Sequence, residues 1–309
     1  MASVPNSLYH VTLANRVIAF VEQQTGADGL KARTLFVLWA FVAACVLTSK
    51  AVAEEPKPDA ILFSESFDDD DLLNRGWYDG TGFRIVSEEA YAGRGCIEYG
   101  WKDKATNPHT SSGVRHALVA TNELFIRYYI KLSEDWDWSG RPYHPHLTHF
   151  LTTENGKWHG PARSHLTLYV EPVNGKLRLG ATDMENENMP HGLTQGPLRG
   201  GYNGKLYDSK DRLLTDNNWH CIEAQFRLNT LDIAHDTANR DGVIRGWFDN
   251  QLVIDHSDII FRTTDFPNMK WNQFILMPHF GPGLLPHAQS LWIDELVVGK
   301  VRVGPLSKP

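Results

Sequence analysis

The chain contains little cysteine, and this limits the kinds of site it can form. Its 309 residues include three cysteines, at positions 45, 96 and 221. They form no CxxC pair and no cluster with histidine, so the sequence shows no zinc site of the usual spacing. Cys96 and Cys221 are far apart in the chain, and the sequence leaves open whether they form a disulfide or remain two buried thiols.

An excess of positive charge is also lacking. The formal net charge is −7 and the pI is near 6.0. Nucleic-acid-binding proteins present a basic face, so this balance argues against a nucleic-acid partner. Amphipathic helical periodicity is absent as well: after residue 60 no segment of about twelve residues or more follows a 3.6-residue period.

No apolar run is long enough for a comfortable transmembrane helix, which needs about 20 residues. The apolar run Leu35–Leu47 follows Lys31 and Arg33 and precedes the small-residue triplet Ala51–Ala53. A basic segment, an apolar segment and an A-x-A site are typical of a secretory signal peptide, and a retained membrane anchor is the less favoured alternative. We therefore expect a secreted or periplasmic mature protein without a membrane span.

The N-terminal region allows two further interpretations. Val42–Cys45 resembles a bacterial lipobox, which would leave the mature protein lipid-anchored through Cys45. The basic pair also lies about thirty residues from Met1, further than in an ordinary signal peptide. We interpret this as translation that starts at Leu30. The expected division is a mis-assigned extension at 1–29, a signal peptide at 30–53, a polar linker at 54–59 and one folded domain at 60–309.

From residue 60 onward, apolar and polar residues alternate with the period of β-strands. In Phe125–Leu132, for example, Ile126 and Tyr128 share one face while Arg127 and Tyr129 share the other. Turn sequences such as Asn174-Gly175 and Asp241-Gly242 separate the strands. Other clear strand segments are His165–Glu171, Trp219–Asn229, Ile244–Asp249, Gln273–Phe280 and Leu291–Val298. The pattern predicts an all-β jelly-roll sandwich of two antiparallel sheets.

Several short segments resemble a known family. They are Ser64–Asp68, Asn218–Glu223, the D-G-x-x-x-x-W-x-D pattern of Asp241–Asp249, and Leu291–Glu295. Together they are similar to the concanavalin A-like lectin/glucanase superfamily, and within it to jelly-roll polysaccharide lyases of the alginate and glucuronan lyase type. The resemblance covers about residues 60–302 and implies a concanavalin A-like jelly roll that acts on polysaccharide.

The chain departs from the related jelly-roll glycosidases. Their strand motif with Glu, Asp and Glu at alternate positions is missing. Because glycoside hydrolysis needs two carboxylates beside the bond, a lyase is favoured over a hydrolase. We expect an exported lyase that cleaves a uronate-containing polysaccharide by β-elimination. The alternatives are a lectin-like binding domain without catalysis and, less favoured, a glycoside hydrolase. We expect a bacterial protein. It should be a monomer and should need no organic cofactor.

The outward strand faces carry the candidate site residues. They are rich in His, Tyr, Arg and Trp, which suit an anionic sugar because Arg pairs with carboxylates and Trp offers a flat apolar surface. For any single residue the alternative is ordinary cross-strand packing. The predicted catalytic residues are His146, Arg163, His165 and Tyr169, and the predicted substrate-binding residues are Tyr129, Glu223, Arg227, Arg245, Trp247 and His279.

β-Elimination requires a base, an acid and a group that neutralises the uronate carboxylate. We assign the base to His165 or His146, because the pKa of histidine lies near the operating pH, and the acid to Tyr169, because a tyrosine hydroxyl can donate a proton. Arg163 or Arg245 is the expected neutralising group. The outer face of one curved sheet is expected to form a groove for the polysaccharide. His165 and Tyr169 lie about 13 Å apart along one strand, so Tyr169 should partner a residue of a neighbouring strand or only line this groove.

The resemblance also implies a structural calcium ion where the first and last strands of the domain meet. Glu65 or Asp68 together with Asp294 are the expected oxygen ligands. The alternative for the acidic run Asp68–Asp71 is a solvated turn. The segment Arg141–His149 holds three histidines, and we interpret it as a proline-stiffened loop entering a strand in preference to a zinc site.

Overall fold

The computed structural model of the chain describes residues 58–80, 82–138, 146–153, 167–182, 204–279 and 285–306. The chain divides into two compact units, Met1–Glu54 and Glu55–Pro309, and all described residues belong to the second. The predicted extension and signal peptide lie outside the described residues. Within the described ranges, no helix is both long and apolar enough to cross a bilayer.

The described part of the second unit is built from β-strands and short 3-10 helices, and no α-helix occurs in it. The 3-10 helices are Pro58–Ala60, Leu73–Arg75 and Ile233–His235. The strands are β1 (Ile61–Glu65), β2 (Trp77–Tyr78), β3 (Ile85–Val86), β4 (Cys96–Trp101), β5 (Val114–Thr121), β6 (Glu123–Leu132), β7 (His146–Thr152), β8 (Thr167–Val173), β9 (Lys176–Thr182), β10 (Gly204–Asp208), β11 (His220–Arg227), β12 (Leu231–Asp232), β13 (Thr237–Ala238), β14 (Gly242–Phe248), β15 (Gln251–Ile259), β16 (Trp271–His279) and β17 (Gln289–Gly299).

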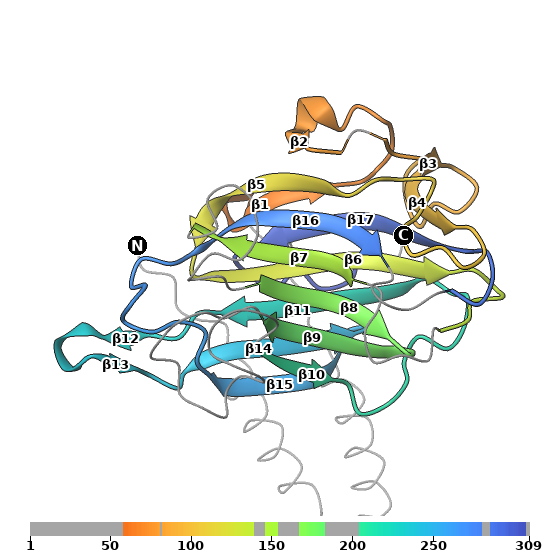
Figure 1. The fold of residues 1–309 in the computed structure, drawn as a ribbon. Helices are drawn as coiled ribbons and strands as arrows, with labels where there is room; N and C mark the ends of the chain where they lie inside the picture. The colour runs from red at the N-terminus through yellow and green to blue at the C-terminus, as the bar shows by residue number, and fades with distance from the viewer. Residues whose placement is uncertain are drawn as a thin grey trace, which may run out of the picture. The chain divides into compact units, whose positions relative to one another are not determined.

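These strands form two large antiparallel sheets that face one another (Figure 1). Sheet A has the order β15-β14-β11-β6-β17-β4-β3, and β1 also pairs with β17. Sheet B has the order β10-β9-β8-β7-β16-β5-β2. Strands β12 and β13 form a separate small hairpin. The predicted all-β jelly-roll sandwich is confirmed.

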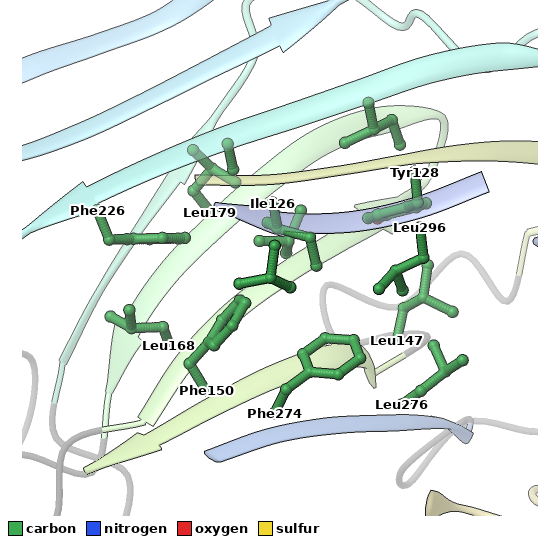
Figure 2. Packing of buried hydrophobic residues seen from close by; sticks show 14 of the residues in the cluster. Ile126, Tyr128, Leu147, Phe150, Leu168, Leu179, Phe226, Phe274, Leu276 and Leu296 are labelled. Atoms are coloured by element: carbon green, nitrogen blue, oxygen red, sulfur yellow. The ribbon is translucent and has the colours of Figure 1, made fainter. Parts of the chain in front are cut away.

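The core lies between the two sheets and follows the alternation of the sequence. Ile126 and Tyr128 of β6 and Phe226 of β11 face Phe150 of β7 and Phe274 of β16 (Figure 2). Each side chain of this size contributes about 1.5–3 kcal/mol when it is removed from water. The residues between them in sequence must therefore point to the outer faces, where the candidate site residues are found.

Two tight turns take the left-handed backbone that their residues favour. Asn174 and Gly175 join β8 to β9 with φ of 51° and 82°, and Asp249 and Asn250 join β14 to β15 with φ of 47° and 71°. Asn, Asp and Gly are the residues that tolerate such angles in two-residue hairpin loops. These turns fix the register of both hairpins and hence which side chains meet across the strands.

Both cysteines of the described region are buried free thiols. Cys96 lies on β4 and Cys221 on β11, with β17 and β6 between them. Three strand spacings amount to about 14 Å, which is too far for a disulfide. The disulfide alternative is therefore wrong, and the two-thiol alternative is confirmed.

Candidate functional site

The outer face of sheet B carries a group of polar side chains that we call the polar face. It consists of His149 on β7, Tyr169 and Glu171 on β8, Arg178 on β9 and Asp208 on β10. Their strands pair so that His149 lies opposite Tyr169, Glu171 opposite Arg178, and Arg178 opposite Asp208. Their neighbours Phe150, Leu168, Val170, Leu177 and Leu179 belong to the core. Alternation alone therefore brings these polar groups to one surface.

His149 and Tyr169 are in direct contact. Their ring centroids are 4.5 Å apart, with the planes at 67°. His149 is 4% exposed and Tyr169 is 7% exposed, so both rings are largely shielded from bulk water. An imidazole accepts or donates a proton near neutral pH and a phenol can donate one, so the pair can carry out acid–base chemistry.

Arg178 forms a forked ion pair beside this pair. Its Nε and Nη2 donate to the two oxygens of Asp208 at 2.6 Å and 2.8 Å. Burial of the guanidinium lowers the pKa of Arg178, but its hydrogen bonds to Asp208 and the negative charges of Asp208 and Glu171 outweigh this effect, so the net shift is upward. Arg178 therefore stays cationic, and the two hydrogen bonds to Asp208 hold its planar guanidinium in one orientation. Such a planar fork is the geometry with which arginine pairs with carboxylates.

A second arginine lies on the same face, further across the sheet. Arg115 of β5 pairs with Ile275 of β16, which pairs in turn with His149. Two strand spacings place Arg115 about 10 Å from His149. The Nε of Arg115 is 2.9 Å from Asp79. Cationic groups thus stand on both sides of the His149–Tyr169 pair.

The structure describes only part of the predicted catalytic set. Tyr169 lies on the polar face, and the residue that contacts it from a neighbouring strand is His149. His146 and His279 are opposite one another on β7 and β16, but their side chains are outside the described residues. Arg163 and His165 also lie outside the described residues. Their roles stay predictions.

The remaining predicted substrate-binding residues lie on the other sheet. Tyr129 is on β6, Glu223 on β11, and Arg245 and Trp247 on β14, all on the outer face of sheet A. Two sheets separated by the core cannot share one groove, so the expectation that these residues converge with Tyr169 is wrong. In particular, Arg245 cannot neutralise a sugar carboxylate bound at Tyr169, and its Nε instead pairs with Asp255 at 2.7 Å.

Residues 301–306, which we call the C-terminal strap, contact the side chains of three of those predicted residues. The Nε of Arg302 is 3.0 Å from Glu223, whose other oxygen accepts from Val303 N at 2.7 Å and Gly304 N at 3.1 Å. The guanidinium of Arg302 lies 4.6 Å from the Trp247 ring centroid. Leu306 N donates to the Tyr129 hydroxyl at 2.8 Å. Arg227, a further predicted substrate-binding residue on β11 of the same sheet, donates to the Asp241 carbonyl at 3.2 Å. These contacts give the side chains structural roles.

The carboxylates of the expected calcium site face N–H donors. Glu65 accepts from Phe67 N, Arg75 Nε and Trp77 Nε1 at 2.9, 2.8 and 3.0 Å. Asp294 accepts from Tyr91 N at 2.8 Å and Ala92 N at 3.2 Å, while Asp68 accepts from Arg94 N.

Asp68 and Asp294 therefore hold the 91–94 turn from its two ends. In the described part of the chain, no group of three or more His, Cys, Asp or Glu is arranged to hold a metal. Oxygens already turned toward N–H donors do not fit a calcium ligand set. The calcium ion stays a prediction without support from this geometry.

Sequence reasoning missed His149, Glu171, Arg178 and Asp208. The alternation of His165–Glu171 did place Glu171 on the Tyr169 side. The other members of the group are brought to Tyr169 by the pairing of β8 with β7 and of β9 with β8 and β10. This pairing depends on tertiary structure, so no local pattern in the sequence indicates it.

Comparison with known proteins supports the fold. No family model and no curated protein matches the chain. Among solved structures, alginate lyase vAL-1 from Chlorella virus matches with a TM-score of 0.57 and 13% identity, over 78% of this chain and 100% of that one. The PL-14 alginate lyase from Aplysia kurodai matches at 0.56 and 14%, over 78% and 99%. Alginate lyase Aly36B with alginate trisaccharide matches at 0.53 and 14%, over 79% and 100%. The resemblance to jelly-roll lyases is thus confirmed for the fold.

Proposed function

We propose that the domain is a polysaccharide lyase that cleaves a uronate-containing polysaccharide by β-elimination. The observation that carries the proposal is the contact between His149 and Tyr169 on the outer face of sheet B. Support comes from the fold, which is that of three lyases whose names state that they act on alginate. The forked Arg178 and the more distant Arg115 add cationic groups to the same face.

The elimination assigns one role to each member of the pair. His149 takes the C5 proton, the electron pair of the C5–H bond becomes the C4=C5 double bond, and the C4–O4 bond breaks. Tyr169 gives its proton to the departing O4. A cationic group must neutralise the C6 carboxylate, because this makes the C5 proton acidic. Arg163 keeps its predicted role as that group, and His165 is the alternative base.

The placement of the pair bears on the substrate. His149 and Tyr169 are cross-strand neighbours and would approach the sugar from one side. Base and acid on one side suit a uronate whose C5 proton and O4 lie on the same ring face. Mannuronate and glucuronate have this arrangement and guluronate does not. We also propose that residues 30–53 direct export of the enzyme.

The test is to incubate the protein with alginate and with glucuronan. Formation of the unsaturated uronate product is followed by its ultraviolet absorbance. We expect product from mannuronate-rich alginate or glucuronan, and a loss in kcat of about 10²–10⁴-fold in Tyr169→Phe and in His149→Gln. Tyr207→Phe, a core tyrosine of β10, is the matched control and should keep full activity. Binding without product would favour the lectin-like alternative, and new reducing ends without absorbance would favour a hydrolase.

A further inference from the structure

Three half-buried aromatic side chains lie on the outer face of sheet A, away from the polar face. They are Tyr91, Trp219 and Trp292, and we call them the aromatic strip. Trp292 lies between Leu291 and Ile293 of β17, which both face the core, so its side chain points outward. Trp219 directly precedes β11 and contacts Tyr91, which itself stacks on the outward ring of Tyr129.

The register of the strands sets the spacing of the two tryptophans. Trp292 is the Cα partner of Lys131 on β6. His220 is the Cα partner of Ile130, and continuing this register places Trp219 on the opposite side of Lys131. Trp292 and Trp219 are therefore two strand spacings apart, about 10 Å. This is close to the length of one disaccharide in an extended glycan.

Two of the three rings, Tyr91 and Trp219, pack against other aromatic side chains. The Tyr91 and Tyr129 rings stack with centroids 3.7 Å apart and planes at 17°, and Tyr91 meets Trp219 edge-on at 5.9 Å. The backbone N–H of Tyr91 is fixed by Asp294, as described above. Rigid aromatic groups lose little conformational freedom on binding, so such an arrangement favours affinity.

Polar groups of both signs border the rings. The Nζ of Lys131 is 5.8 Å from the Trp292 ring centroid and 2.5 Å from Glu89. Glu98 is the Cα partner of Trp292 on β4 and pairs with Arg84 at 2.9 Å. Sugar rings offer apolar faces for the aromatics, together with hydroxyls that both donate to carboxylates and accept from cations. A nucleic acid would require a basic surface, which this balanced set does not provide.

The strip also differs from the tryptophan that the C-terminal strap covers on the same sheet. Arg302 lies over Trp247, which is 8% exposed, whereas Trp219 and Trp292 are half-buried. We propose that the aromatic strip is a second glycan-binding site, which holds a polysaccharide chain on the face opposite the polar face. This site needs no catalysis, and it would anchor the protein on polymer independently of turnover.

Affinity electrophoresis in gels that contain alginate or glucuronan tests the proposal. The runs use the Tyr169→Phe background, so that the polymer is not degraded. We expect Trp219→Ala and Trp292→Ala together to weaken retardation by about tenfold, which corresponds to roughly 1.4 kcal/mol. Trp138→Ala, a half-buried tryptophan outside the strip, is the matched control and should run like the parent.

Hydroxyl-radical footprinting of the unmodified protein gives a readout that does not depend on how the variants fold. Added polymer should reduce oxidation of Trp219 and Trp292 but not of Trp138. Unchanged retardation in the double variant, or unchanged oxidation of both tryptophans, would overturn the proposal. Failure of the proposed lyase activity has a different signature, namely the absence of unsaturated product while retardation persists.

Discussion

At the scale of single residues, His220 makes an unusual pair of contacts. Its Nδ1 is 2.7 Å from Asp249 and its Nε2 is 2.9 Å from Asp216. Only the protonated imidazolium can donate from both nitrogens. Burial lowers the pKa of His220, but the hydrogen bonds with the two carboxylates outweigh this effect and the pKa is raised. The charged ring therefore joins the β14–β15 turn to the segment before β11.

This arrangement predicts a pH-dependent contribution to stability. A histidine whose pKa is raised by folding stabilises the folded state below its unfolded pKa, near 6.5, and this contribution is lost as pH rises through the folded pKa. We expect the difference in unfolding free energy between the wild type and His220→Gln to shrink as pH rises from about 6 to above the folded pKa. Urea unfolding at a series of pH values measures this difference.

Asp294 also titrates in part of this pH range. Because the wild type and His220→Gln both contain Asp294, its contribution cancels in the difference between them. Burial raises its pKa to about 7, although the N–H groups of Ala92, Tyr91 and Glu295 act in the opposite direction. A raised carboxyl pKa also makes stability fall as pH rises, so only the difference between the two proteins reports on His220. His235→Gln, at an exposed histidine paired with Asp232, is the control. A pH-independent difference for His220→Gln would contradict the prediction.

The residue scale also shows where sequence reasoning succeeded and where it stopped. The inward faces of β6, β8 and β11 follow from alternation, because burial of one face is a local pattern. Tyr169 was found in this way. His149 was not, because its importance comes from lying opposite Tyr169, and the choice of strand partners is made by tertiary structure.

At the scale of elements, the C-terminal strap depends on one buried carboxylate. The Glu223 side chain is 2% exposed and binds Arg302 together with two backbone N–H groups, whereas the Arg302 side chain is 38% exposed. Loss of Glu223 would leave buried donors without an acceptor. Loss of Arg302 would leave Glu223 with its backbone partners and with partial access to water.

We therefore expect Glu223→Ala to destabilise the domain by about 3–5 kcal/mol, and Arg302→Met to cost clearly less. Chemical denaturation of both variants measures the two values. Glu134→Ala, at an exposed glutamate, serves as the control and should change stability by less than about 0.5 kcal/mol. Equal costs for Glu223→Ala and Arg302→Met would show that the strap is not organised around the carboxylate.

Elements also explain the largest error in the sequence analysis. The outward residues of β14, such as Arg245 and Trp247, show the same alternation as Tyr169 of β8. The pattern states that a residue faces away from the core but not which of two sheets carries it. Because the sheets lie on opposite sides of the core, residues expected in one groove were divided between two surfaces.

At the scale of the whole molecule, Cys96 and Cys221 are free thiols, so no disulfide joins the strands that carry them. Burial raises the pKa of both Cys96 and Cys221 to about 12, and nearby carboxylates add to the effect. Buried thiols of this kind are unreactive, since the thiolate is the nucleophile. In a Cys45→Ser protein, we expect a thiol reagent at pH 8 to label neither cysteine until the domain unfolds, and a reductant to leave Tm unchanged. Rapid labelling of the native protein, or a lower Tm with reductant, would contradict this.

The position of β17 has a consequence for the order in which the domain is built. This strand is made last among the described strands, yet it lies in the middle of sheet A, with β6 on one side and β4 and β1 on the other. Until it leaves the ribosome, the first strands of the domain have no neighbour to join them to the rest of the sheet. Such long-range pairing is slow to form. The first strands of the domain therefore reach their places in sheet A only after β17 has been synthesised.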